Sequence, residues 1–355
     1  MNELCVRAGK SAYEIIRAGD FTFDNVTTYV GAAPGPRWLV ATGFDRSILK
    51  NGVLGNKRPT VLAGSSAGAM RFAAWMQPEP EKSYERLIDG YIAMNFTRKD
   101  TPETILQSIR DLIDSYIDDD ALSFALNNKR YRLAIITARA KRLAASNVRW
   151  LQMLSLGTAF VCNGLSRRMI HRFFQRVVFH NSPILPYFCL NYDFRGQAIP
   201  LNEANFKHAL LASAAVPLSA AGVRDIYGAP GGMYRDGGLT DYHLNQRYSG
   251  GKGAVTLLFN HQRHLVPTWL DKNFSSRQPP REYLEDVLMV YPSTDFMRKL
   301  PYGRAPDRED FKRYANNPPK RMRDWRRAVA VSERLGEQFL ELVASGRLRE
   351  VTERM

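Results

Sequence analysis

The sequence predicts an α/β fold with a central, mostly parallel sheet flanked by helices. Short apolar runs of strand length alternate along the chain with segments of helical periodicity, and this alternation is typical of parallel sheets. The chain has 355 residues, of which 45% are hydrophobic and 24% are charged. Such a composition is ordinary for a globular protein and sufficient for a sizeable core.

Five buried strands are predicted from the apolar runs, at 38–43, 59–64, 133–137, 254–259 and 287–291. Helices are predicted at 69–76, 145–178, 206–215 and 325–345, with a polar, helix-compatible insertion over 78–130. Residues 271–284 and 301–319 are expected to be surface loops. We therefore expect an N-terminal extension at 1–35, a main domain at 36–300, and a C-terminal loop and helix at 301–355 packed on it.

Residues 61–70 carry the most informative motif of the chain. Gly64-Ser65-Ser66-Ala67-Gly68 follows two apolar residues and precedes a helix-compatible run, which is the context of a nucleophile elbow. The flanking glycines lack the Cβ atoms that would clash across so tight a turn. Ser66 would then begin a helix, whose first N–H groups and positive dipole end favour a developing oxyanion. A plain glycine-rich turn is the alternative.

A second motif offers a carboxylate that can act as a base. Asp236-Gly237-Gly238 predicts a compact turn that holds the carboxylate at a fixed angle, although Asp-Gly turns are also common without a function. A helix of small residues over 209–216 ends before Pro217 and leads through a loop into this turn.

These motifs, in this order, resemble the patatin-like phospholipase family. The Ser66 pentapeptide matches the family's nucleophile elbow, and Asp236 matches its Asp-Gly-Gly motif. The segment 213–217 matches the small residues that usually precede that aspartate. The family's glycine-rich oxyanion loop matches only partly, at 42–47 followed by Gly-Val-Leu at 52–54. The resemblance extends from about residue 36 to about residue 260.

The resemblance implies a three-layer fold and a serine acyl hydrolase with a Ser66–Asp236 dyad. Ser66 would attack the acyl carbonyl to form an acyl-enzyme, and Asp236 would accept its proton and later help to activate water. Neither a metal nor an organic cofactor is implied.

The same resemblance assigns the oxyanion hole to the backbone N–H groups of Gly43, Phe44 and Ala67. Phe44 replaces a glycine of the family's loop, and glycine angles are costly for a phenylalanine. Arg46 is kept, and it would brace this loop or contact a phosphate head group.

A histidine triad is the alternative mechanism. His261 and His264 follow a predicted strand and come after Asp236, so the order from Ser66 onward is that of an α/β-hydrolase triad. The Asp-Gly-Gly motif and its upstream segment favour the dyad. The remaining histidines are His171, His180, His208 and His243.

A net charge of +15 points to an anionic partner. Basic clusters occur at 129–132, 141–142, 167–176 and 320–327, with aromatic and apolar residues between them. They come without a helix-turn-helix, zinc-finger or RNA-recognition signature, so no nucleic acid is expected. Beside a lipase-like motif, the favoured partner is an anionic membrane surface, and the favoured substrate is a phospholipid or another acyl-ester lipid.

Two other classes of function stay open. The same dyad would serve an esterase or thioesterase on soluble acyl substrates, with an incidental basic surface. The altered oxyanion loop favours a catalytically weak lipid- or membrane-binding protein on the same scaffold. Cys5, Cys162 and Cys189 lie far apart, which fits a reducing compartment. With no secretory signal recognisable, the expected location is the cytoplasm, peripheral to membranes, and export without a cleavable signal stays open.

Overall fold

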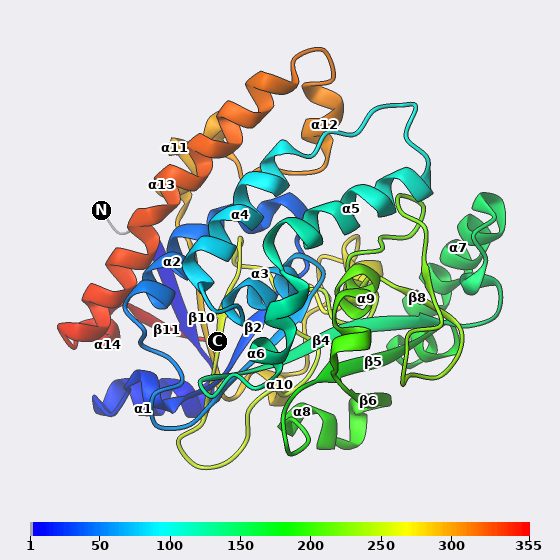
Figure 1. Cartoon of the computed structure of the whole chain (residues 1–355). Helices are drawn as coiled ribbons and strands as arrows, with labels where there is room; N and C mark the ends of the chain where they lie inside the picture. The colour runs from blue at the N-terminus through cyan, green and yellow to red at the C-terminus, as the bar shows by residue number, and fades with distance from the viewer. Residues whose placement is uncertain (1–2) are drawn as a thin grey trace.

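The computed structural model describes residues 3–355, which form one mixed, mostly parallel sheet of 11 strands flanked by helices (Figure 1). The strand order is β11-β1-β10-β9-β2-β3-β4-β5-β6, and β8 pairs with β4 and with β7. The central pairs from β10 through β9, β2 and β3 to β4 are all parallel. The strands are β1 Leu4–Ala8, β2 Val26–Gly31, β3 Thr60–Ser65, β4 Tyr131–Ala140, β5 Phe174–His180, β6 Gly196–Pro200, β7 Val223–Arg224, β8 Met233–Arg235, β9 Val255–Phe259, β10 Val287–Pro292 and β11 Thr352–Arg354.

Side chains that alternate along the strands enter two cores. Leu62 of β3 belongs to the larger core, whereas the next residue, Ala63, belongs to the core on the opposite face. Long helices, including α2, α3, α4, α5, α9 and α13, cover the larger core, and the short helices α8 and α10 with irregular segments cover the other. The helices are α1 Lys10–Ala18, α2 Thr42–Lys50, α3 Ala67–Trp75, α4 Pro80–Ala93, α5 Pro102–Tyr116, α6 Leu122–Leu126, α7 Arg149–Leu165, α8 Tyr187–Leu190, α9 Glu203–Ser213, α10 Arg281–Leu284, α11 Thr294–Lys299, α12 Glu309–Arg313, α13 Pro318–Ala344 and α14 Leu348–Val351.

Both ends of the described chain take part in the sheet. β1 runs antiparallel to β10, and β11 lies parallel to β1 at the outer edge. β2 is central, between β9 and β3. The expected extension at 1–35 is therefore wrong for residues 3–35, and residues 1–2 lie outside the described part. Of the expected C-terminal loop and helix, residues 352–354 are a further strand of the sheet.

The predicted strands at 59–64, 133–137, 254–259 and 287–291 correspond to β3, β4, β9 and β10. The predicted strand at 38–43 is wrong, because residues 35–41 form a 3-10 helix and α2 begins at Thr42. A short buried apolar run has the same composition in a strand and in a buried helix, so its pattern alone does not separate the two. The predicted helix at 145–178 ends with α7, and its last residues belong to β5.

A buried ion pair fixes α3 against α2. Arg71 donates to the two carboxylate oxygens of Asp45 at 2.6 and 2.7 Å, and the Tyr29 hydroxyl donates to Asp45 Oδ1 at 2.6 Å. Because Arg71 and Asp45 are both buried, removing either would leave a buried charge uncompensated, at a cost of about 3–5 kcal/mol. The helix that begins at the candidate nucleophile is thus rigidly held.

None of the helices in the described part of the chain combines the length and the apolarity needed to cross a bilayer.

Candidate active site

Ser66 occupies the sharp turn between β3 and α3. Its φ of 53° and ψ of −122° lie outside the regions that non-glycine residues usually adopt, as expected for a strained nucleophile elbow. The turn also needs the two glycines of the motif. A Cβ on Gly68 would lie 2.1 Å from the carbonyl oxygen of Gly31, and one on Gly64 would lie 2.5 Å from the nitrogen of Ala69. Only glycines allow β2, β3 and α3 to approach so closely.

A buried serine holds the elbow in place. The Oγ atom of Ser213, at the end of α9, accepts a hydrogen bond from the Ser66 N–H at 2.8 Å. The same hydroxyl donates to the carbonyl oxygen of Ile136 in β4 at 2.7 Å. Ser213 is fully buried, so no water competes for these two bonds. One side chain therefore connects the nucleophile's backbone to α9 and to the central strand β4.

The register of β4 brings the aspartate turn to the same place. β3 lies parallel to β4 with Ser65 opposite Ile136, and β8 lies antiparallel to β4 a few residues further on. The chain leaves β8 at Asp236, and Gly237 then passes close to both strands. A Cβ on Gly237 would lie 2.0 Å from the Ile136 carbonyl oxygen and 3.2 Å from the Ser65 Cβ. The Asp-Gly-Gly turn is thus packed directly against the elbow.

Two backbone hydrogen bonds set the angle of the carboxylate. The N–H of Asp236 donates to the carbonyl oxygen of Ala215 at 3.0 Å, which joins the turn to the small-residue segment 213–217. The Oδ1 atom of Asp236 accepts from the N–H of Gly238 at 2.7 Å. A Cβ on Gly238 would lie 2.8 Å from that same Oδ1 atom, so the second glycine also leaves room for the carboxylate.

The electrostatics of Asp236 suit a base. Burial raises the pKa of Asp236, and the Ser66 hydroxyl is first among the groups that partly offset this rise, followed by Arg308. Its Oδ2 atom is buried, and no residue within 3–355 makes a well-aligned hydrogen bond to it. The Ser66 hydroxyl therefore lies beside the carboxylate without completing a hydrogen bond to it. Catalytic hydrogen bonds often tighten only when substrate is bound.

Ser66 opens into an apolar cavity of about 630 Å³. This size lies within the range of cavities that enclose small-molecule ligands. Most of its walls are aliphatic, aromatic or thioether side chains from α3, α4, the segment after α4, α5 and α12, which suits an acyl chain. Among them are Met70, Tyr91, Met94, Phe96, Ile105, Ile109 and Phe311.

Asp236 lines a second, smaller cavity of about 180 Å³, which is polar. Besides Asp236, its charged lining residues are Arg37, Asp307, Glu309, Lys272 and Arg308. The Lys272 ammonium lies 4.2 Å from the ring centre of Tyr242, and its side chain is exposed at the cavity mouth. Surrounding protein atoms, together with repulsion from Arg308 and Arg37, lower the pKa of Lys272. Gly35, Val216, Arg308 and Glu309 line both cavities, so the two spaces adjoin.

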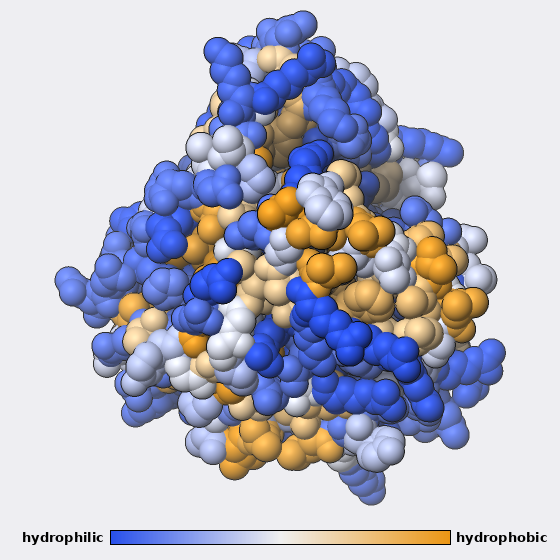
Figure 2. Space-filling view, turned by 90° about the vertical axis from the view of Figure 1, so that its right-hand side faces the viewer, coloured by the Kyte–Doolittle hydropathy of each residue, from blue (hydrophilic) through white to orange (hydrophobic). Residues whose placement is uncertain are grey.

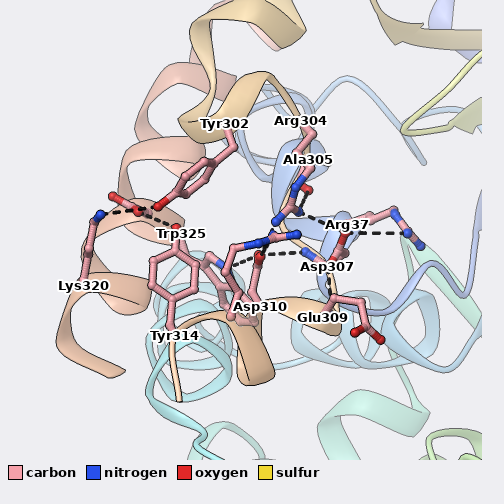
Figure 3. A network of polar contacts seen from close by, with 12 residues as sticks. Arg37, Tyr302, Arg304, Ala305, Asp307, Glu309, Asp310, Tyr314, Lys320 and Trp325 are labelled. Carbon is pink, nitrogen blue, oxygen red and sulfur yellow. Dashed lines mark hydrogen bonds and ion pairs between the residues drawn. The ribbon is translucent and has the colours of Figure 1, made fainter. Parts of the chain in front are cut away.

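A C-terminal segment, residues 307–315, contributes to the walls of both cavities. Asp310 is buried, and its carboxylate accepts a hydrogen bond from the Trp325 indole of α13 at 3.0 Å (Figure 3). Arg37, from the 3-10 segment after β2, lies 3.9 Å from the Asp307 carboxylate. The segment is therefore anchored to α13 through Asp310, and through Asp307 it lies close to the 3-10 helix that precedes α2.

The predicted oxyanion donors Gly43 and Phe44 lie elsewhere, and this expectation is wrong. Both belong to α2, where the Gly43 N–H donates to the Ser332 hydroxyl of α13 at 2.9 Å. The Phe44 ring is buried in the core, with ring centres 4.9 Å from Phe259 and 5.0 Å from Phe339. Because this segment is helical and packed under α13, its N–H groups are not available to a substrate.

Arg46 also lies away from both cavities. Its guanidinium donates to Glu85 of α4 at 2.6 Å and to Glu333 of α13 at 3.1 Å. The expected contact with a phosphate head group is therefore wrong. The residue does act as a brace, but between three helices rather than at an oxyanion loop.

Two other backbone N–H groups belong to residues that line the Ser66 cavity. Ala67 is the first residue of α3, and Gly35 is the first residue of the 3-10 helix that follows β2. The first N–H groups of a helix have no acceptor within that helix. Gly35 has a φ of 61°, which favours glycine. Sequence reasoning missed Gly35 because it missed β2, although the β-branched run at 26–30 was an available signal.

The histidines proposed for a triad do not line the cavities of Ser66 and Asp236. His261 packs on His243 with ring centres 5.2 Å apart, and it lines a separate small cavity. Burial is the main cause that lowers the pKa of His261 to about 3. Within residues 3–355, no histidine lines the cavities of Ser66 or Asp236. The arrangement favours a dyad.

Comparison with known proteins finds no matching family model and no matching curated protein. The interpretation of this site therefore depends on its geometry and on the motifs themselves. Over the described residues, no group of three or more His, Cys, Asp or Glu side chains is arranged to hold a metal ion.

Proposed function

We propose that this chain is a serine acyl hydrolase that cleaves acyl esters of membrane lipids, as phospholipases A and lysophospholipases do. The observation that carries the proposal is the strained turn at Ser66 beside the buried Oδ2 atom of Asp236. The patatin-like, three-layer architecture is part of the same proposal. It is supported by the contact between the elbow, the segment 213–217 and the Asp-Gly-Gly turn, which follow each other in the family's order.

The proposed reaction has two halves. Ser66 Oγ attacks the ester carbonyl while its proton passes to Asp236 Oδ2, and the carbonyl oxygen becomes an oxyanion. The N–H groups of Ala67 and Gly35 stabilise that oxyanion, and such a donor is worth about 10²–10³ in rate. The C–O bond to the alcohol then breaks, and the leaving alkoxide takes the proton from Asp236. In the second half, water gives a proton to Asp236 and attacks the acyl carbon of the acyl-enzyme. The bond between that carbon and Ser66 Oγ then breaks, Ser66 takes the proton back from Asp236, and the fatty acid is released.

The two cavities support a lipid substrate with a polar alcohol part. The cavity at Ser66 has apolar walls that shield an acyl chain from water. The adjoining cavity at Asp236 contains charged side chains of both signs, with Arg37, Lys272 and Arg308 beside Asp307 and Glu309, and such a lining suits a polar group at the leaving-alcohol side. Head-group recognition of this kind requires that the alcohol part enters the polar cavity.

Fluorophosphonate labelling tests the dyad directly. We expect the wild-type protein to be labelled at Ser66, with no labelling of Ser66→Ala. Labelling of Asp236→Asn should be slower by about 10²-fold or more, because the base is lost. Ser65→Ala is the matched control, because Ser65 is also buried and lies one residue away. The Ser65→Ala protein should be labelled at Ser66 at the wild-type rate.

Labelling of the folded Asp236→Asn protein at the wild-type rate would rule out the dyad. A folded wild-type protein that does not label would favour a lipid-binding protein on a hydrolase scaffold. If Ser66 labels but only soluble esters are cleaved, with no effect of salt, the esterase alternative is correct.

A further inference from the structure

Helix α7 exposes several large hydrophobic side chains to solvent, while its buried face is partly polar. The buried side chains of the inner face are polar at Gln152, Ser155 and Asn163, and apolar at Leu156 and Ala159, which belong to a small core cluster. The outward side chains include Trp150, which is 61% exposed, and Val161, also 61% exposed. Met153, Leu154 and Leu165 are exposed on the same helix. A surface helix that packs on a core normally exposes polar residues, so the exposed apolar side of α7 is unusual.

The polar side chains of the inner face are anchored by specific hydrogen bonds. Gln152 accepts from the Leu218 N–H at 2.5 Å, and the Asn163 amide donates to the buried carboxylate of Asp271 at 2.7 Å. The orientation of α7 is therefore fixed by the protein, and its apolar face is left without a partner. Figure 2 views the side on which α7 lies in Figure 1, and hydrophobic side chains gather there above a hydrophilic band.

The sequence around α7 carries positive charge without any acidic residue. No Asp or Glu occurs between Asp120 and Asp193. The basic residues of this interval are Lys129, Arg130, Arg132, Arg139, Lys141, Arg142, Arg149, Arg167, Arg168, Arg172 and Arg176. Four of the arginines nearest to α7 in sequence are exposed and form no ion pair with any residue of 3–355: Arg142, Arg149, Arg168 and Arg172.

The helix is adjacent to the candidate active site. Leu218, which α7 contacts through Gln152, directly follows the Val216-Pro217 pair that lines the polar cavity. Ser219 and Ala220, the next residues, line the apolar cavity of Ser66. A surface that holds α7 would therefore lie close to the segment that borders both cavities.

We propose that α7 is an interfacial docking helix that binds the protein to an anionic lipid bilayer. An exposed apolar face with a tryptophan enters the boundary between head groups and acyl chains, and the surrounding arginines are attracted to anionic lipids. A second copy of this chain fits less well, because self-association would bring the unpaired arginines of the two copies together. The inference of membrane docking depends only on α7 and the arginines near it. Its purpose, the delivery of lipid to Ser66, rests on the proposed function.

Vesicle flotation tests the docking without catalysis, with Ser66→Ala as the background protein. Vesicles of phosphatidylcholine with roughly a third of phosphatidylglycerol should bind the protein, and pure phosphatidylcholine should bind it weakly. The double variant Trp150→Ser/Val161→Ser should bind the anionic vesicles about tenfold less tightly or worse. Arg149→Gln and Arg168→Gln should each weaken binding about fivefold, and added salt should do the same.

Matched controls come from other parts of the surface. Phe124→Ser removes an exposed aromatic side chain of α6, and Arg326→Gln removes an exposed arginine of α13. Both should bind vesicles like the background protein. With Ser66 intact, the α7 variants should keep their rate on a short soluble ester and lose rate only on vesicles.

Unchanged vesicle binding of the α7 variants would overturn the proposal. So would a concentration-dependent dimer that Trp150→Ser abolishes, since the apolar face would then belong to a second copy. Capture of the protein by an acidic protein in place of anionic vesicles would overturn it as well. Vesicle binding through α7 together with absent Ser66 labelling would leave the docking intact and refute only the hydrolase.

Discussion

Replacement of Ser213 by alanine tests how the elbow is held. The change removes the acceptor of the Ser66 N–H and the donor to the Ile136 carbonyl, both in the protein interior. A buried polar group without a partner costs about 1–3 kcal/mol, and a carbonyl falls toward the lower end. We therefore expect Ser213→Ala to lower the free energy of unfolding by about 2–4 kcal/mol.

The expected change in melting temperature follows from chain length. An unfolding entropy of about 2.1 cal/mol/K per residue gives about 0.75 kcal/mol/K for the 355 residues. The loss should thus lower the melting temperature by about 3–5 °C, which differential scanning calorimetry resolves. Because the freed turn can relax its strained φ, fluorophosphonate labelling of the folded variant should slow by about tenfold to a hundredfold.

Ser332→Ala is the matched control for this experiment. The Ser332 hydroxyl also accepts a backbone N–H, from Gly43 at 2.9 Å, and donates to a carbonyl oxygen, that of Val329 at 2.7 Å. It is equally buried, but it lies at the contact of α2 with α13. Ser332→Ala should lower the free energy of unfolding by a similar amount to Ser213→Ala, with no change in the labelling rate of the folded protein. Equal labelling rates of the two variants and wild type would refute the inference that Ser213 positions the nucleophile.

Three further outcomes are expected. Gly68→Ala should destabilise the fold by several kcal/mol, measured by denaturant unfolding, because its Cβ would lie 2.1 Å from the Gly31 carbonyl oxygen. Arg46→Ala should lose at most about 1 kcal/mol and keep the labelling rate of Ser66, because its ion pairs are partly exposed and remote from the cavities. Since burial raises the pKa of Asp236 and the base must be ionised, labelling should fall with decreasing pH through that raised pKa, above the ordinary range near 4. The same raised pKa should make the fold less stable as pH rises from the unfolded to the folded pKa of Asp236, because the native state then binds more protons. A labelling profile flat down to the ordinary aspartate range would contradict Asp236 as the base.

Local motifs allowed much of the fold and the two main site residues to be predicted. The elbow could be predicted because its glycines, apolar strand and helix are contiguous in sequence, and the structure has β3, the turn and α3 at those positions. The Asp-Gly-Gly turn could be predicted for the same reason. The catalytic roles of Ser66 and Asp236 stay predictions until the labelling experiment is done.

The errors arose where tertiary contacts decide the structure. The segment around Phe44 is helical and packs under α13, nearly three hundred residues later in the chain, and no local pattern reveals that contact. The partial match to a glycine-rich loop then placed the oxyanion donors in α2, whereas the loop after β2 lies beside Ser66. The anchoring role of Ser213 could not be predicted either, because both of its partners are backbone atoms.

Ile136 explains why such distant segments form one site. Ser65 lies opposite Ile136 in the parallel ladder, and Ser213 donates to the Ile136 carbonyl oxygen. Gly237 passes so close to that oxygen that a Cβ on Gly237 would lie only 2.0 Å from it. All of these contacts involve the backbone of β4, so the relative position of Ser66 and Asp236 depends on strand register rather than on side-chain packing. A conservative change of the Ile136 side chain should therefore leave the dyad in place. A one-residue slip of β4 against β3 or β8 would move the nucleophile away from its base and reverse the face of every side chain on the strand. Alternate side chains of β4 enter the cores on opposite faces, Leu133 and Ile135 the larger core and Ala134 and Ile136 the other, and this opposes such a slip. The sheet thereby fixes the geometry that the proposed chemistry requires.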